Sequence, residues 1–316
     1  MTLAVLLLLA IATAGMVTAL TWRWAAVVAP NTPSAMDTAR KAGRAMQRHP
    51  GPASALAARL DPRAATGLGL TLALIAIVGG GVLLAVLAYL IRGNTDLVRL
   101  DESVANWGDR HASAFSTDGL NAVTHLGAPI VVAGLAAILA VVETVRTRSA
   151  WVVPFLLVVA AGNGILTTTV KDLADRVRPA LNPVAETLGP SFPSGHSSWS
   201  AAFFAAAALL LSRRRSRHTR AVIAGAAAGL VVLVAGSRVL LDVHWLSDVI
   251  AGVALGLGWF SICAIAFGGR LLRFGAAAEE ATRVAEDRSL GARPAASPSL
   301  SGSASTSIRA SSGEQL

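Results

Sequence analysis

The sequence is poor in charged residues and in cysteine for a chain of its length. Only 14% of its 316 residues are charged and 54% are hydrophobic, whereas a soluble protein carries about a quarter charged residues. This deficit argues against an ordinary soluble globular protein and favours a membrane protein. The single cysteine, Cys263, excludes an internal disulfide and leaves the redox compartment undetermined.

The net charge of +9 is the one feature that could indicate nucleic-acid binding. The basic residues, however, cluster in the stretches between apolar runs, where membrane topology accounts for them. We therefore expect a lipid bilayer, and no nucleic acid, as the partner of this chain. The sequence does not indicate an oligomeric state.

Apolar runs recur along the chain at lengths that suit membrane helices. Seven segments lie near 3–21, 68–91, 127–143, 151–170, 197–212, 221–237 and 245–267. Their Leu, Ala and Val runs lack strict alternation, and in a bilayer core only helices or closed barrels satisfy the backbone. The pattern predicts an all-α, polytopic membrane bundle with six core helices and one additional N-terminal helix.

Composition divides the chain into three parts. Residues 1–66 hold the first helix and a basic, proline-containing linker, and residues 67–270 hold the six-helix core. Residues 271–316 are rich in Ala, Ser, Gly and Arg, which cannot bury a core, so we expect a disordered tail. The first helix lacks the positive start of a signal peptide, so we expect it to remain uncleaved.

The basic stretch 213–220, with five arginines, predicts the orientation of the bundle. If this stretch faces the cytoplasm, the connecting stretches must alternate between the two sides, because each helix crosses the membrane once. The stretches 22–66 and 144–150 and the C-terminal tail then also lie inside. The stretches 92–126, 171–196 and 238–244 then face outside. Lys171, Arg176 and Arg178 violate the rule, which indicates that these cations have another role.

Three short motifs fall on the predicted outer face. They are KDLADRVRP at 171–179, PSGH at 193–196 and SRVLLDVHWLSD at 237–248. Each has an ordinary structural reading, as a helix stop, a helix start or an interface anchor. Their joint occurrence at one face is hard to explain by structure alone.

The motifs contain the groups that an oxyanion site needs. Lys171, Arg178 and Arg238 are cations at membrane ends, and together they require an anion to neutralise them. Ser194 and Gly195 precede a predicted helix, whose free N–H groups suit phosphate. We therefore predict that these five residues bind a phosphate group.

Two histidines and an aspartate in the same motifs can perform the chemistry. His244 and Asp248 are four residues apart and share a helix face, so the carboxylate can fix the imidazole tautomer. His244 is then a candidate nucleophile, and His196 a candidate general acid for the leaving oxygen. The predicted reaction proceeds through a phosphohistidine and requires no metal and no cofactor.

The three motifs resemble the signature of the type 2 phosphatidic acid phosphatase (PAP2) superfamily. Lys171 and Arg178-Pro179, residues 193–196, and Ser237-Arg238 with His244 and Asp248 match its three parts without departure. The resemblance extends over a core from about 68 to 267. It implies an all-helical, metal-independent phosphatase, with the same roles for these residues as those argued above.

Membrane members of this family act on lipid phosphates, which sets the expected substrate class. The resemblance implies action on lipids such as undecaprenyl diphosphate, phosphatidylglycerophosphate, phosphatidate or other prenyl phosphates. The high Arg and Ala content and the helix count suggest a bacterial inner-membrane protein, and the orientation above places its site at the outer face. The motifs leave open monophosphate or diphosphate, and a phosphotransferase that uses an acceptor alcohol instead of water. A non-enzymatic lipid binder or transporter is disfavoured because both histidines are present, and a soluble haloperoxidase because the chain is apolar.

Overall fold

The computed structural model describes residues 1–27, 65–93, 95–179, 189–213 and 215–271, which belong to one compact unit, Met1–Phe274. The helices are α1 (Thr2–Val27), α4 (Ala65–Leu90), α5 (Thr95–Arg110), α6 (Ala114–Thr124), the 3-10 helix η1 (His125–Gly127), α7 (Pro129–Thr147), α8 (Val152–Ala174), α9 (Gly195–Leu211), α10 (Arg217–Leu240) and α11 (Leu246–Leu271). The predicted all-α class is confirmed. Most of the expected linker and almost all of the expected tail lie outside the described residues.

Six of the described helices, α1, α4, α7, α8, α10 and α11, are long and apolar enough to cross a membrane. Their outward side chains are also apolar: Ile11, Ile75, Ile130 and Leu157 are each more than 60% exposed. Such a surface is unfavourable in water and is stabilised by hydrocarbon. The chain is therefore a multi-pass membrane protein.

The seventh predicted segment forms α9, a shorter apolar helix of 17 residues at the centre of the bundle. It packs against α8, α10 and α11. Gly256 of α11 allows this close approach, because a Cβ there would overlap the carbonyl oxygen of Ser198. The Oγ of Ser198 in turn donates to Oδ1 of Asn163 at 2.8 Å, which ties α9 to α8 inside the bundle.

The N-terminal helix α1 packs along α10 through small residues. A Cβ at Gly225 would overlap Oγ1 of Thr18 and the carbonyl oxygen of Ala14, and one at Gly236 would overlap Leu6. Glycines in this position let two membrane helices approach at backbone distance. The first helix is thus an integral part of the described bundle.

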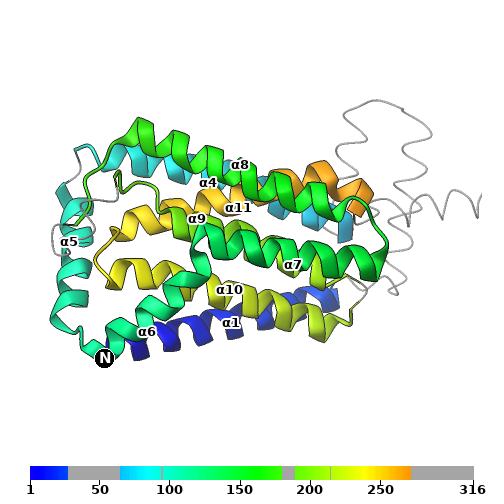
Figure 1. Ribbon diagram of the computed structural model, residues 1–316, viewed down its shortest axis with the longest axis horizontal. Coiled ribbons are helices and arrows are strands. Elements are labelled where there is room, and N and C mark those ends of the chain that lie inside the picture. The colour runs from blue at the N-terminus through cyan, green and yellow to red at the C-terminus, as the bar shows by residue number, and fades with distance from the viewer. Residues whose placement is uncertain (28–64, 94, 180–188, 214, 272–316) are drawn as a thin grey trace, which may run out of the picture. The chain divides into compact units, whose positions relative to one another are not determined.

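One end of the bundle is covered by α5 and α6, where the sequence predicted only a connecting stretch (Figure 1). Helix α5 is amphipathic: Leu97 and Val104 pack inward, while Asp96 and Arg99 form an exposed ion pair. Its mixed composition hides it from a search for long apolar runs. The α8–α9 and α10–α11 connections and the start of α1 lie at this same end (Figure 1).

Candidate active site

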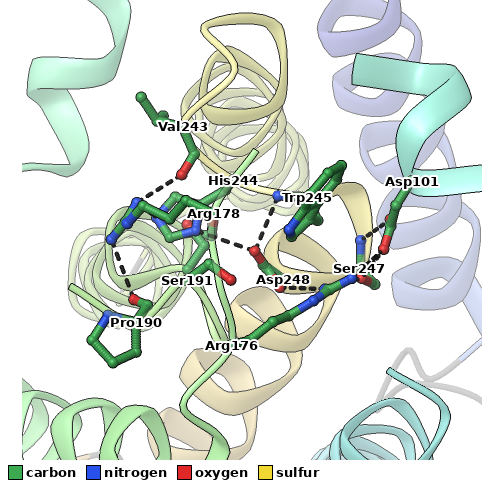
Figure 2. A network of polar contacts seen from close by, with 12 residues as sticks. Asp101, Arg176, Arg178, Pro190, Ser191, Val243, His244, Trp245, Ser247 and Asp248 are labelled. Carbon is green, nitrogen blue, oxygen red and sulfur yellow. Dashed lines mark hydrogen bonds and ion pairs between the residues drawn. The ribbon is translucent and has the colours of Figure 1, made fainter. Parts of the chain in front are cut away.

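The three motifs meet at the end of the bundle that α5 and α6 cover. The backbone N–H of Ser194, at the start of α9, donates to the carbonyl oxygen of Asp248 in the first turn of α11 (2.9 Å). From the segment after α8, Nη1 of Arg178 donates to the carbonyl oxygen of Val243 at 2.6 Å and lies 3.2 Å from Nε2 of His244. Segments distant in sequence therefore form one site (Figure 2).

Two of the predicted phosphate-binding cations, Lys171 and Arg178, are held by the backbone of the α8–α9 connection. Arg178 is buried, its Nε donates to the carbonyl oxygen of Gly189 at 2.8 Å, and burial lowers its pKa. Its Nη2 and the Nζ of Lys171 share the carbonyl oxygen of Pro190. Lys171 and Arg178 lie close enough to repel each other, and an anion bound between them would relieve this repulsion.

Arg238, in the last turn of α10, is the third cation. Its Nη1 donates to Oγ1 of Thr124 at 2.9 Å, while its Nε is buried with no hydrogen-bond partner among the described residues. Its carbonyl oxygen accepts the N–H groups of Val243 and His244, which bends the chain back after α10. A buried donor without an acceptor costs about 1–3 kcal/mol, so this position favours an anionic ligand.

His244 lies between Arg178 and Asp248. Because an arginine can only donate, Nε2 of His244 must be the acceptor, which places the ring proton on Nδ1. Nδ1 faces Oδ2 of Asp248 at 3.5 Å, longer than a strong hydrogen bond. Burial lowers the pKa of His244 to about 4, so its Nε2 is unprotonated at neutral pH.

The second motif forms the N-terminus of α9. Ser194 is fully buried and accepts from Oγ of Ser197 at 2.9 Å, rather than capping a backbone N–H of the helix. A Cβ at Gly195 would meet only Thr167, at an ordinary 3.8 Å, so protein packing does not require glycine there. The absence of a side chain instead leaves space in front of the helix N–H groups, as close approach of an anion would require.

His196, in the first turn of α9, lies within electrostatic range of Arg238 and His244. Its backbone is packed against Gly127, where a Cβ would come 2.9 Å from the carbonyl oxygen of His196. The structure thus brings together all eight residues singled out from the sequence, and it adds η1 as a support for this histidine.

Three polar residues at the site were assigned no place in it from the sequence. Thr124 binds Arg238, and Arg176 binds both Asp101 and Asp248. The breach of the positive-inside rule was a signal for Arg176, but Asp101 and Thr124 lie in a stretch expected to be a loop and gave no signal. The ion-pair partner of Asp248 is therefore Arg176, which lies outside the residues predicted for the site.

Comparison with known proteins agrees with this geometry. Residues 151–271, which contain all three motifs, match the model of the PAP2 superfamily. Phosphatidylglycerophosphatase B of Bacillus subtilis (strain 168) is 31% identical over 162 residues, which are 50% of this chain and 78% of that protein. The chain belongs to the PAP2 superfamily.

A solved PAP2 structure is also similar to this PAP2 protein. The crystal structure of the first transmembrane PAP2 type phosphatidylglycerolphosphate phosphatase from Bacillus subtilis has a TM-score of 0.54 and 27% sequence identity. The similarity covers 60% of this chain and 94% of that one. The predicted family, the membrane fold and the enzyme class, a phosphatase, are confirmed.

Proposed function

We propose that this PAP2 phosphatase hydrolyses the phosphate ester or diphosphate of a membrane lipid. The observation that carries the proposal is the unprotonated Nε2 of the neutral His244, which lies beside Arg178 and near two further cations, the half-buried Lys171 and the buried Arg238. The apolar outer surface of the bundle supports a substrate that arrives through the bilayer. Similarity to a phosphatidylglycerophosphatase makes phosphatidylglycerophosphate the first candidate, ahead of undecaprenyl diphosphate and phosphatidate.

The proposed reaction has two displacement steps at phosphorus. Nε2 of His244 forms a bond to phosphorus while the bond from phosphorus to the leaving oxygen breaks, and His196 gives that oxygen a proton. Water, losing a proton to His196, then attacks phosphorus, and the bond to Nε2 breaks to release phosphate and regenerate both histidines. Asp248 stabilises the positive charge that the imidazole of His244 acquires in the first step.

Phosphate binding is the proposed role of the residues around His244. Lys171, Arg178 and Arg238 would hold the negative charge of the transferred group, which stays high throughout the reaction. The N–H groups at the start of α9 would add donors, with Ser194 and Gly195 shaping the approach. The three cations supply charge that metal ions supply in other phosphatases, so we expect chelation to leave activity unchanged.

The proposed orientation places the site at the outer face of a bacterial inner membrane, with the C-terminus in the cytoplasm. Its support is the arginine-rich stretch 213–220, which joins α9 to α10 at the end of the bundle opposite the site. A substrate would then enter from the outer leaflet.

The deciding experiment is phosphate release by the purified protein in detergent with EDTA. The substrates are phosphatidylglycerophosphate, undecaprenyl diphosphate, undecaprenyl phosphate, phosphatidate and a soluble phosphate ester, with His244→Ala as control. We expect release from one lipid and a loss in the control of about 10⁴-fold or more, because the nucleophile is gone. Full activity of the control would exclude the mechanism, and product formed only with an added alcohol would indicate a phosphotransferase.

A further inference from the structure

Arg176 lies outside the three-part signature, yet it is central to the polar network beside His244 (Figure 2). Its Nη1 donates to Oδ1 of Asp248 at 2.6 Å and to Oγ of Ser247 at 2.7 Å, and its Nη2 donates to Oδ2 of Asp101 at 2.8 Å. Both carboxylates are buried, with Asp101 only 1% exposed and Asp248 not exposed at all. One guanidinium therefore joins α5 to the first turn of α11.

The two oxygens of the Asp248 carboxylate have separate partners. Oδ1 is bound by Arg176, whereas Oδ2 accepts from the backbone N–H of Trp245 at 3.0 Å and faces Nδ1 of His244 at 3.5 Å. The contact to Arg176 fixes the rotation of the carboxyl group, since a buried oxygen that lost it would need another donor. This rotation decides which oxygen faces the imidazole.

Asp101 changes the charge balance of this network. An arginine paired with Asp248 alone would cancel the negative charge that His244 needs behind it. Asp101 supplies a second carboxylate to the same guanidinium, and its own oxygens are bound by the backbone N–H and the Oγ of Ser247. Two carboxylates and one guanidinium leave one net negative charge on this side of the imidazole.

The position of Arg176 is itself fixed by its neighbours. Its guanidinium carbon lies 5.5 Å from the ring centre of Trp245, and Nε1 of Trp245 donates to the carbonyl oxygen of Val177 at 2.9 Å. Two residues after Arg176, Arg178 contacts Nε2 of His244, the ring nitrogen on the side away from Asp248. The segment 176–178 therefore holds both sides of the imidazole at once.

We propose that Arg176, held in place by Asp101, is a positioning residue that keeps the carboxylate of Asp248 directed at His244. The inference deepens the proposed function and rests on it, because it assigns the support of the attacking histidine. The charged and titratable groups around His244 are Asp248 from α11, Arg176 and Arg178 from the segment after α8, Lys171 from α8, His196 from α9, Arg238 from α10 and Asp101 from α5.

The test measures the titration of His244 directly, so it does not depend on turnover. The protein, labelled with ¹⁵N-histidine, is titrated by NMR in detergent, and the His244 signal among the six histidines is the one lost in His244→Ala. Arg176→Gln removes a positive charge behind Asp248 and is expected to raise the pKa of His244 by roughly one unit. Asp101→Asn removes a negative charge and is expected to lower it, while Arg176→Lys is expected to stay near wild type.

Exposed residues of α5 provide matched controls. Arg99→Gln and Asp96→Asn make the same chemical changes at side chains that are 75% and 87% exposed, and both should leave the titration unchanged. Shifts of the same sign in Arg176→Gln and Asp101→Asn, or no shift in either, would overturn the proposal. If both variants fail to fold while the controls fold, the network is purely structural and the proposal is wrong.

Phosphate release by the same preparations separates this inference from the proposed function. An active wild type with an inactive His244→Ala supports the function, whatever Arg176 does. In that case Arg176→Gln should lower kcat more than it raises KM, because Asp248 acts on charge that develops in the transition state. An inactive wild type would contradict the proposed function, while the NMR titration would still decide the role of Arg176.

Discussion

Two groups of charged side chains lie on either side of His244, and they are satisfied to different degrees. On one side, Arg176 is bound by Asp101 and Asp248, and each of these charges has a partner of opposite sign. On the other side three cations gather, and the Nε of Arg238 has no hydrogen-bond partner among the described residues. The first group is satisfied within the protein, whereas we expect an anionic ligand to complete the second.

The strongest way to test this contrast is to remove a cation from the ligand side. Arg238→Gln should lower kcat/KM by about 10²–10³-fold, because one donor to the transferred phosphate is lost. Its melting temperature in detergent should stay the same or rise, since the repulsion among the three cations decreases. An active but unstable Arg238→Gln protein would contradict the contrast.

In the group formed by Arg176, Asp101 and Asp248, we expect a substitution to lower the stability of the protein. Asp101→Ala leaves Arg176 with a single carboxylate partner, Asp248. It also removes the acceptor of the backbone N–H and of the Oγ–H of Ser247. Together these losses should lower the free energy of unfolding by about 3 kcal/mol. Unfolding by denaturing detergent measures this value. Asp96→Ala, on the exposed face of the same helix, should change it by less than about 0.5 kcal/mol.

The pH dependence of activity tests the state of His244 between the two groups. The neutral imidazole is the reactive form, and burial lowers the pKa of His244 to about 4. Activity should therefore persist as the pH falls through 6.5 and should decrease about tenfold per unit only below pH 4. A midpoint near the ordinary histidine value in the ¹⁵N titration of His244 itself would show that the imidazole is not buried in this way.

The smallest effect is expected where the molecule holds no charge, at the contact between α1 and α10. Gly225→Ala would push a methyl group into the backbone of Ala14, which should cost about 1–3 kcal/mol of stability while kcat is unchanged. Gly79→Ala, where no atom lies within 4 Å, is the matched control. A large loss of kcat in Gly225→Ala would instead connect α1 to the chemistry.

The sequence was informative where a single stretch of chain carries the signal. Apolar runs predicted the membrane helices, and the three motifs predicted His244 and the seven other residues that the structure brings near it. The sequence did not reveal the pairing of Arg176 with Asp101, because the two lie 75 residues apart and each alone is an ordinary charged residue. Thr124 was missed for the same reason, since its contact with Arg238 spans 114 residues.

The short length of α9 has a consequence for the depth at which the site lies in the membrane. Its 17 residues span about 25 Å, less than the hydrocarbon thickness of about 30 Å, whereas the 26 residues of α11 span about 39 Å. The start of α9 lies beside the first two turns of α11: the N–H of Ser194 donates to the carbonyl oxygen of Asp248, and a Cβ at Gly252 would overlap the carbonyl oxygen of Ser194. Helix α9 therefore begins within the length of α11 and not at its outer end. A phosphate attached to lipid chains is already held near that level by its own anchor, while a free phosphate ester would have to descend and give up hydration. We therefore expect the position of this helix start to favour substrates whose phosphate is held at the same depth by lipid chains.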